Sequence, residues 1–210
     1  MNVPSPTTTV FLVDDDPSVL RAVSRLVRSA GWNVAAFNSP QEFLEKHPPD
    51  APGCVVLDVA MPGLNGLELQ QALARAGHSL PIIFLTGHGD IPMSVRAMKS
   101  GAVDFLSKPC RDENLLEAIR QALARDQQAR EARAEQQALT ARFTRLTPRE
   151  TEVMFGVVAG KLNKQIADEL GTVEKTIKVH RARVMEKLEV KSVAELVRLV
   201  EHAGVGGEAK

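Results

Sequence analysis

Residues 9–125 alternate between short apolar runs and longer amphipathic stretches. The apolar runs, which are typical of buried strands, lie near 9–13, 33–37, 54–57, 82–86 and 104–107. Between them, apolar residues recur at a spacing of three and four, which is typical of amphipathic helices. These predicted helices cover 17–30, 40–47, 65–76, 91–99 and the residues from 112 onward. Five strand–helix units of this kind predict an open parallel sheet with helices on both faces, an α/β fold.

The polar residues that end these apolar runs have complementary chemistry. The runs end in the carboxylates of Asp14, Asp15 and Asp58, the hydroxyl of Thr86 and the amine of Lys108. Because such sheets bind ligands outside the carboxyl ends of their strands, these side chains are expected to share one crevice. Carboxylates suit Mg²⁺, and Asp58 beside such an ion could accept a phosphoryl group as an acyl phosphate. Any one of these aspartates could equally be a turn residue or a helix cap.

A second compact unit is predicted to start near Phe143. Thr147-Pro148-Arg149-Glu150 has the pattern of a capping box with proline at the first helical position. The helices predicted after it cover 148–159, 163–170, 174–188 and 192–202, and the short joint at Leu170-Gly171-Thr172 suits a helix-turn-helix. The Ala-, Gln-, Glu- and Arg-rich stretch before it predicts a solvated helical linker. The predicted parts are therefore 9–124, a linker over 125–141, and an all-α unit over 142–207.

The predicted helix 174–188 has a distinctive exposed side. Ile177, Val184 and Leu188 have the spacing of a core stripe. Basic and small residues are left outside, at Lys175, Lys178, Val179, Ala182 and Arg183, together with Glu186. Such a surface can enter the DNA major groove, where lysine reaches guanine acceptors and small apolar side chains touch thymine methyl groups. Any solvated helix also turns charges outward, so this helix alone leaves a purely structural role open.

Composition narrows the class of protein. Lys plus Arg and Asp plus Glu both number 26, so whole-chain charge does not indicate a partner. Cys54 and Cys110 show neither a metal-binding spacing nor a disulfide framework, and Cys54 is expected in the core. Apolar runs are shorter than the roughly 20 residues of a membrane span, and residues 1–9 lack the pattern of a secretion signal. A soluble cytoplasmic protein without membrane contact is expected.

The first part of the chain resembles the two-component response regulators over about 9–125. The matching motifs are Val13-Asp14-Asp15, Asp58 with Met61-Pro62-Gly63-Leu64-Asn65-Gly66, Thr86-Gly87-His88-Gly89-Asp90, Gly101-Ala102-Val103-Asp104-Phe105-Leu106 and Lys108-Pro109. The resemblance implies a flavodoxin-like receiver domain whose Asp58 is phosphorylated by a sensor histidine kinase.

The resemblance also implies a role for each residue of the crevice. Mg²⁺ would be bound by Asp14, Asp15, Asp58 and the carbonyl of Ala60, with Asp15 binding directly and Asp14 through water. Thr86 and Lys108 would bind the phosphoryl oxygens. Thr86 and Phe105 would form the switch, and the Lys108-Pro109 bond would be cis. Asp16 is instead expected to cap a helix, and His88 to be a structural loop residue.

Residues 143–205 resemble the LuxR-type DNA-binding domain, in the FixJ branch of response regulators. The matching motifs are Leu146-Thr147-Pro148-Arg149-Glu150, Asn163-Lys164-Gln165-Ile166-Ala167, Leu170-Gly171, Thr176-Ile177-Lys178-Val179-His180, and Lys187-Leu188 with Val197. The resemblance implies base contacts by Lys178, Val179 and Ala182. It implies phosphate contacts by Lys164, Lys175, Thr176, Arg183 and Lys187. Val173 stands where relatives often carry a capping Ser or Thr, and Thr172 could replace it by shifting the helix start by one residue.

Together these features predict a transcription regulator controlled by phosphorylation, an activator by its FixJ likeness, and not an enzyme. Its expected partners are a sensor histidine kinase, double-stranded promoter DNA, RNA polymerase and a second copy of the chain. The homodimer would form on phosphorylation through 91–99 and 104–107, and the stripe of Val193, Leu196, Val197 and Val200 would pair the DNA-binding units. The alternatives are a Mg²⁺-dependent acyl-phosphate phosphatase and a phosphorylation switch that acts through protein contacts only.

Overall fold

The computed structural model describes residues 8–87 and 90–205. The chain divides into two compact units, one ending at Arg130 and the other beginning at Glu131. The expectation for His88 and the last residues of the predicted 142–207 unit lie outside the described residues. Among the helices that are described, none is both long and apolar enough to cross a membrane.

The first unit contains a parallel sheet of five strands in the order β2-β1-β3-β4-β5. The strands are β1 (Thr9–Val13), β2 (Asn33–Phe37), β3 (Gly53–Leu57), β4 (Ile82–Thr86) and β5 (Asp104–Ser107). The helices are α1 (Pro17–Ser29), α2 (Pro40–Lys46), α3 (Gly66–Arg75), α4 (Ile91–Lys99) and α5 (Asp112–Phe143). The predicted α/β sheet is confirmed, with differences of a residue or two at helix ends.

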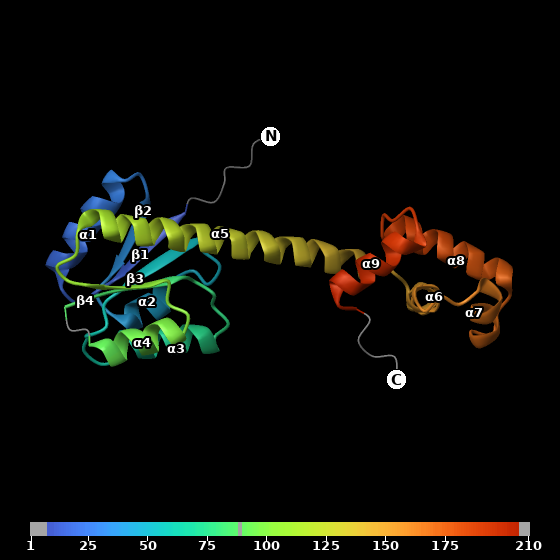
Figure 1. The fold of residues 1–210 in the computed structure, drawn as a ribbon, viewed down its shortest axis with the longest axis horizontal. Coiled ribbons are helices and arrows are strands. Elements are labelled where there is room, and N and C mark those ends of the chain that lie inside the picture. The colour runs from blue at the N-terminus through green and yellow to red at the C-terminus, as the bar shows by residue number, and fades with distance from the viewer. Residues whose placement is uncertain (1–7, 88–89, 206–210) are drawn as a thin grey trace. The chain divides into compact units, whose positions relative to one another are not determined.

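The sheet lies between two groups of helices (Figure 1). Helices α1 and α5 cover one face, where Leu20 and Ile119 pack against β-strand residues such as Ile83. Helices α2, α3 and α4 cover the other, where Phe43 and Leu69 close a second core. Both faces are therefore buried, which explains why β3 and β4 are continuous apolar runs rather than alternating ones. Cys54 is fully buried in the core on the side of α1 and α5, as expected.

The strand register brings the predicted site residues to one edge. Val13 pairs with Leu57, so Asp14 and Asp58 each follow a paired residue. The Asp58 N–H donates to the Val13 carbonyl at 2.9 Å, which aligns the two strand ends. On the other side, the Lys108 N–H donates to the Thr86 carbonyl at 2.8 Å. Parallel pairing therefore carries the acids, the hydroxyl and the amine to the same rim.

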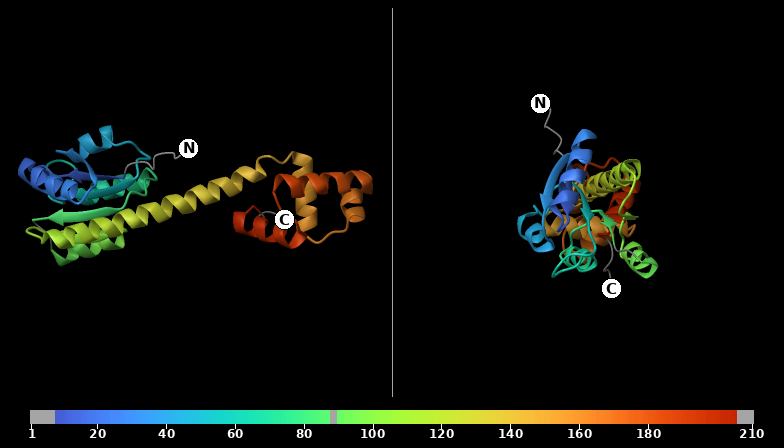
Figure 2. Two further views of the ribbon diagram at one scale, coloured as in Figure 1. Left: turned by 90° about the horizontal axis from the view of Figure 1, so that it is seen from above. Right: turned by 90° about the vertical axis from the view of Figure 1, so that its left-hand side faces the viewer.

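Helix α5 is one unbroken helix that includes the predicted linker over 125–141 (Figure 2). Residues 131–138 are exposed, as a solvated linker should be. The start of that stretch differs from the prediction, because Asp126 is buried and Arg130 is half-buried. Both side chains form hydrogen bonds with backbone groups of residues 50–53 in the first unit. The local sequence of α5 does not reveal these contacts.

The second unit consists of α6 (Pro148–Val158), α7 (Asn163–Glu169), α8 (Glu174–Lys187) and α9 (Val193–Ala203). The predicted helices are confirmed, and so is the capping box that starts α6. The Thr147 hydroxyl accepts from the Glu150 N–H at 3.3 Å, and the Glu150 carboxylate accepts from the Thr147 N–H at 2.9 Å. Ile177, Val184 and Leu188 are buried in the core of this unit, as their spacing predicts.

The apolar stripe of α9 is only partly used by this unit's own core. Leu196 and Val200 are buried there, whereas Val193 and Val197 remain half-buried. Pairing of two units through this stripe stays a prediction, with Val193 and Val197 as its accessible part. Helix α8 does not start one residue earlier with Thr172 as its cap, the alternative that the sequence left open. Val173 is the N-cap and has no side-chain capping bond, while the Thr172 N–H closes the preceding turn on the Ala167 carbonyl at 2.9 Å.

Candidate functional site

Three carboxylates meet at the rim of the sheet. Oxygen atoms of Asp14, Asp15 and Asp58 lie within 4.8 Å of one another. Asp14 and Asp58 are buried, whereas Asp15 is exposed to solvent. Burial raises the pKa of Asp14, although the ammonium of Lys108 opposes this shift. The site thus concentrates negative charge and opens to water on the Asp15 side.

Lys108 supplies the positive charge that holds these acids together. Its Nζ lies 2.5 Å from Asp14 Oδ2 and 3.4 Å from Asp58 Oδ1. The segment that carries it leaves β5, and the Lys108-Pro109 peptide bond is cis, as the resemblance implies. Because its side chain remains partly exposed, the ammonium can reach a ligand that enters from solvent.

One oxygen of Asp58 lacks a hydrogen bond. Asp58 Oδ1 is buried and accepts no hydrogen bond from the part of the chain that the structure describes. Its nearby cation, Lys108, forms its short contact with Asp14 instead. A buried acceptor without a donor costs about 1–3 kcal/mol. A metal ion or a phosphorus atom that engages this oxygen would therefore remove an existing penalty.

The loop after Asp58 is shaped by a close backbone contact. The Gly66 N–H donates to the Val59 carbonyl at 3.0 Å, which folds the loop back on the end of β3. A Cβ atom at Gly66 would lie only 2.2 Å from the Asp58 carbonyl oxygen, so a larger residue would displace the backbone of Asp58. Ala60 lies exposed in this loop, between Asp58 and α3.

The predicted switch residues lie on neighbouring strands. Thr86 is fully buried at the end of β4. Phe105 is half-buried on β5, and its ring centroid lies 5.9 Å from that of Phe84. Asp16 is separate from the acidic cluster and caps α1, as expected. Its carboxylate accepts from the Ser18 N–H at 2.7 Å, and this bond lowers the pKa of Asp16.

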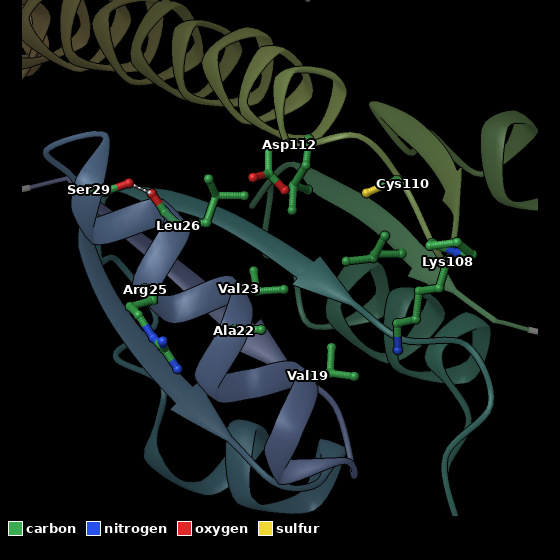
Figure 3. Close-up of a pocket in the computed structure, with 12 residues that line it drawn as sticks. Val19, Ala22, Val23, Arg25, Leu26, Ser29, Lys108, Cys110 and Asp112 are labelled. Carbon is green, nitrogen blue, oxygen red and sulfur yellow. Dashed lines mark hydrogen bonds between the residues drawn. The ribbon is translucent and has the colours of Figure 1, made fainter.

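A groove that was not predicted from the sequence opens beside Lys108 (Figure 3). It encloses about 700 Å³ between α1 and the segment that leads from β5 into α5. Helix α1 lines it with apolar side chains, at Val19, Ala22, Val23 and Leu26. The signal was present in the sequence, since these residues give α1 a wider apolar face than contact with the sheet alone requires.

Helix α8 presents the predicted set of polar and small residues to solvent. Lys175, Lys178, Val179, Ala182 and Arg183 are exposed, as is Lys164 on α7. Thr176 is half-buried. The Arg181 guanidinium donates to Asn163 Oδ1 at 3.2 Å, so α8 is tied to the first turn of α7. This bond fixes the relative position of the two helices that form the helix-turn-helix.

Lys187 has a different partner from the implied DNA phosphate. Its Nζ donates to Glu150 Oε2 at 2.6 Å, and Glu150 is only 2% exposed. The Lys187 ammonium, together with the Thr147 N–H, lowers the pKa of Glu150 to about 2. Because a buried carboxylate needs this counter-charge, Lys187 stabilises the fold of the unit, and its implied phosphate contact stays a prediction.

The comparisons with known proteins agree with both units. Residues 10–120 match the model of the response regulator receiver domain, and residues 144–200 match that of bacterial regulatory proteins of the luxR family. The chain is 51% identical over 196 residues to nodulation protein W of Bradyrhizobium diazoefficiens, covering 93% of this chain and 86% of that protein.

Two further similarities span nearly the whole chain. The transcriptional regulatory protein FixJ of B. diazoefficiens is 43% identical over 196 residues, which is 93% of this chain and 96% of that protein. The solved structure of the response regulator StyR is 49% identical, with a TM-score of 0.86, and the match covers 93% of this chain and 99% of that one. The chain belongs to the response regulators that join a receiver domain to a LuxR-type DNA-binding domain.

Proposed function

We propose that this transcription regulator is switched by phosphorylation of Asp58. The observation that carries the proposal is the buried Asp58 oxygen that accepts no described hydrogen bond, with Lys108 Nζ 3.4 Å away. The carboxylate oxygen would attack the phosphorus of a kinase phosphohistidine. An O–P bond would form as the N–P bond breaks, so the histidine leaves and an acyl phosphate remains.

The donor set fits a magnesium ion. Hard carboxylate and carbonyl oxygens are the ligands that Mg²⁺ prefers, and it usually retains several waters. Asp14, Asp15, Asp58 and the Ala60 carbonyl would hold it, and the exposed side at Asp15 leaves room for water. When bound, the ion would neutralise charge on the transferring phosphoryl oxygens. Lys108 and the hydroxyl of Thr86 would bind the same oxygens from the protein side.

A change at Thr86 would reach the surface of α4. Acyl phosphate adds charge and acceptor oxygens that would draw the Thr86 hydroxyl inward, and Phe105 would turn into the space released. Helix α4 follows the Thr86 loop and exposes Ile91, Val95 and Met98 at a spacing of one helical face. We assign this apolar face, with β5, to a homodimer that forms on phosphorylation.

The groove beside α1 is the proposed docking surface for the sensor histidine kinase. Its apolar wall ends at Lys108, which contacts both Asp14 and Asp58. A helical partner seated there would deliver its phosphohistidine close to the phosphoacceptor. The surface that would recognise the kinase and the residues that would accept the phosphoryl group are thus adjacent, because Lys108 belongs to both.

We propose that the second unit binds promoter DNA through α8. Lys178, Val179 and Ala182 would face base edges, and Lys164, Lys175, Thr176 and Arg183 would contact phosphates. Lys187, which is partly exposed and also pairs with Glu150, is the remaining phosphate contact that the likeness implies. We also propose that the protein activates transcription by recruiting RNA polymerase and that it acts in the cytoplasm beside the kinase, proposals that the likeness to FixJ supports.

The rival enzymatic function is an acyl-phosphate phosphatase. That activity would require a positioned base to activate water against the acyl phosphate. The acids described next to Asp58, Asp14 and Asp15, belong to the proposed metal site, and Lys108 is paired with Asp14. A stable phosphoprotein is therefore expected, and the chain is not assigned an enzymatic turnover.

Labelling with a small acyl phosphate and Mg²⁺ tests the proposal. We expect one phosphoryl group on Asp58 with a lifetime of minutes, measured by intact-protein mass spectrometry during a chase. Continuous phosphate release in excess of protein, without stable labelling, would support the phosphatase instead. A folded chain that is neither labelled nor releases phosphate would contradict both functions.

Salt dependence tests the DNA-binding surface. The Arg183→Gln variant should reduce the slope of log affinity against log salt concentration by about 1, because one phosphate contact is lost.

The Lys178→Ala variant should cost about 1–3 kcal/mol of binding and relax base preference. Lys191→Gln, an exposed lysine outside α8, is the matched control. Equal slopes for Arg183→Gln and the control would count against groove binding. They would favour the alternative function, a switch that acts through protein contacts only.

A further inference from the structure

A cluster of polar contacts joins the middle of α5 to the opposite end of the sheet from Asp58. Asp126 is 3% exposed, and its Oδ2 accepts from the Gly53 N–H at 2.9 Å and from Arg130 Nε at 2.7 Å. The remaining guanidinium nitrogens of Arg130 donate to the carbonyls of Asp50 at 2.9 Å and Ala51 at 2.7 Å. We call this set of contacts the α5 clamp.

The loop before β3 is shaped to accept these contacts. A Cβ atom at Gly53 would lie 1.9 Å from the Thr9 carbonyl oxygen, so only glycine allows the loop to lie so close to β1. The Thr9 N–H donates to the Pro52 carbonyl at 3.0 Å, which fixes the other side of the loop. The loop that carries the carbonyls bound by Arg130 is therefore held against β1 by contacts that do not involve α5.

Arginine is the residue that this geometry requires. Its planar guanidinium offers several donors in a fixed fork, and here Nε, Nη1 and Nη2 each have a separate acceptor. A lysine would present a point charge and could not span the same three acceptors. The buried Asp126 carboxylate in turn needs the positive charge of Arg130, since an unpaired buried charge is strongly unfavourable.

We propose that the α5 clamp fixes the interdomain helix to the receiver as far as Arg130 and thereby couples the receiver's state to the output unit. The apolar contacts of α5 with the sheet include Leu115, Ile119 and Ala122, which all precede the clamp. Residues 131–138, which follow it, are exposed. The clamp thus sets the point at which the helix leaves the receiver, so a rearrangement of the receiver at this point is passed to the helix that continues into the second unit.

Amide hydrogen exchange in the full chain tests the clamp directly. In the Arg130→Gln variant, the amides of Gly53 and residues 124–130 should exchange about tenfold faster or more, the factor expected when a charged hydrogen bond is lost. Asp126→Asn is a milder variant, because its amide oxygen can still accept from Gly53 while the charge that holds Arg130 is gone. Arg133→Gln removes the same charge from the exposed part of the same helix and should change nothing.

Phosphorylation and DNA binding decide whether the clamp carries a signal, a step that rests on the proposed function. Labelling of Asp58 should match the wild-type chain in all three variants, because the clamp lies at the other end of the sheet. The gain in DNA affinity on phosphorylation should fall severalfold in Arg130→Gln and Asp126→Asn only. Unchanged exchange, or faster exchange with an unchanged gain, would overturn the proposal. If the wild-type chain itself were not labelled, or did not bind DNA, the result would contradict the proposed function instead.

Discussion

The Asp58→Asn variant is expected to lose the entire gain in DNA affinity that a phosphodonor gives the wild-type chain. An amide has nearly the same shape as the carboxylate but lacks the anionic oxygen that attacks phosphorus. The backbone bond from Asp58 to the Val13 carbonyl does not involve the side chain, so the rim of the sheet should persist. Binding titrations with selected DNA, with and without acyl phosphate and Mg²⁺, measure the gain.

Asp16→Asn is the control for the negative charge that Asp58→Asn removes. Asp16 lies in the same acidic run, but it caps α1 through Ser18, and asparagine caps helices about as well as aspartate. This variant should keep both phosphorylation and the gain in affinity. A phosphodonor that strengthens DNA binding equally in Asp58→Asn and in wild type would show that the switch lies elsewhere.

The sheet and its crevice could be predicted because the evidence for them is local in sequence. Each strand is a short apolar run that ends in a polar residue, and parallel pairing must place those ends at one rim. The register of Val13 with Leu57 confirms this for Asp14 and Asp58. Helix starts were similarly visible, since the bonds of the Thr147 and Glu150 capping box lie within one turn.

The features that the sequence did not reveal depend on partners far away in the chain. Asp126 bonds to a backbone group 73 residues earlier, and nothing within the Ala-, Gln- and Arg-rich stretch indicates that contact. The bond from Lys187 to Glu150 was hidden in the same way, because the sequence does not show that Glu150 would be buried beneath Lys187. The apolar stripe of α9 had two possible uses, a partner surface or the local core, and periodicity alone cannot distinguish them.

The contacts of Lys108 lead to the second large expected effect. The Lys108→Met variant keeps most of the apolar stem and removes the ammonium that lies 2.5 Å from Asp14 and 3.4 Å from Asp58. Loss of a preorganised donor to a reacting oxyanion typically slows catalysis by about 10²–10³-fold. We therefore expect labelling of Asp58 by acyl phosphate to slow by about that factor at saturating Mg²⁺.

The affinity for Mg²⁺ should rise in the Lys108→Met variant, although the rate of Asp58 labelling falls. In the structure, the Lys108 ammonium occupies the Asp14 oxygen Oδ2. Without that competing cation, the buried carboxylates repel each other more strongly, and a divalent ion relieves the repulsion. Lys108→Met should thus bind Mg²⁺ more tightly while reacting more slowly, whereas Lys108→Arg should restore part of the rate. Metal titration beside labelling kinetics separates the two effects. If the variant lost affinity and rate together, Lys108 would be serving the fold of the rim rather than the phosphoryl group.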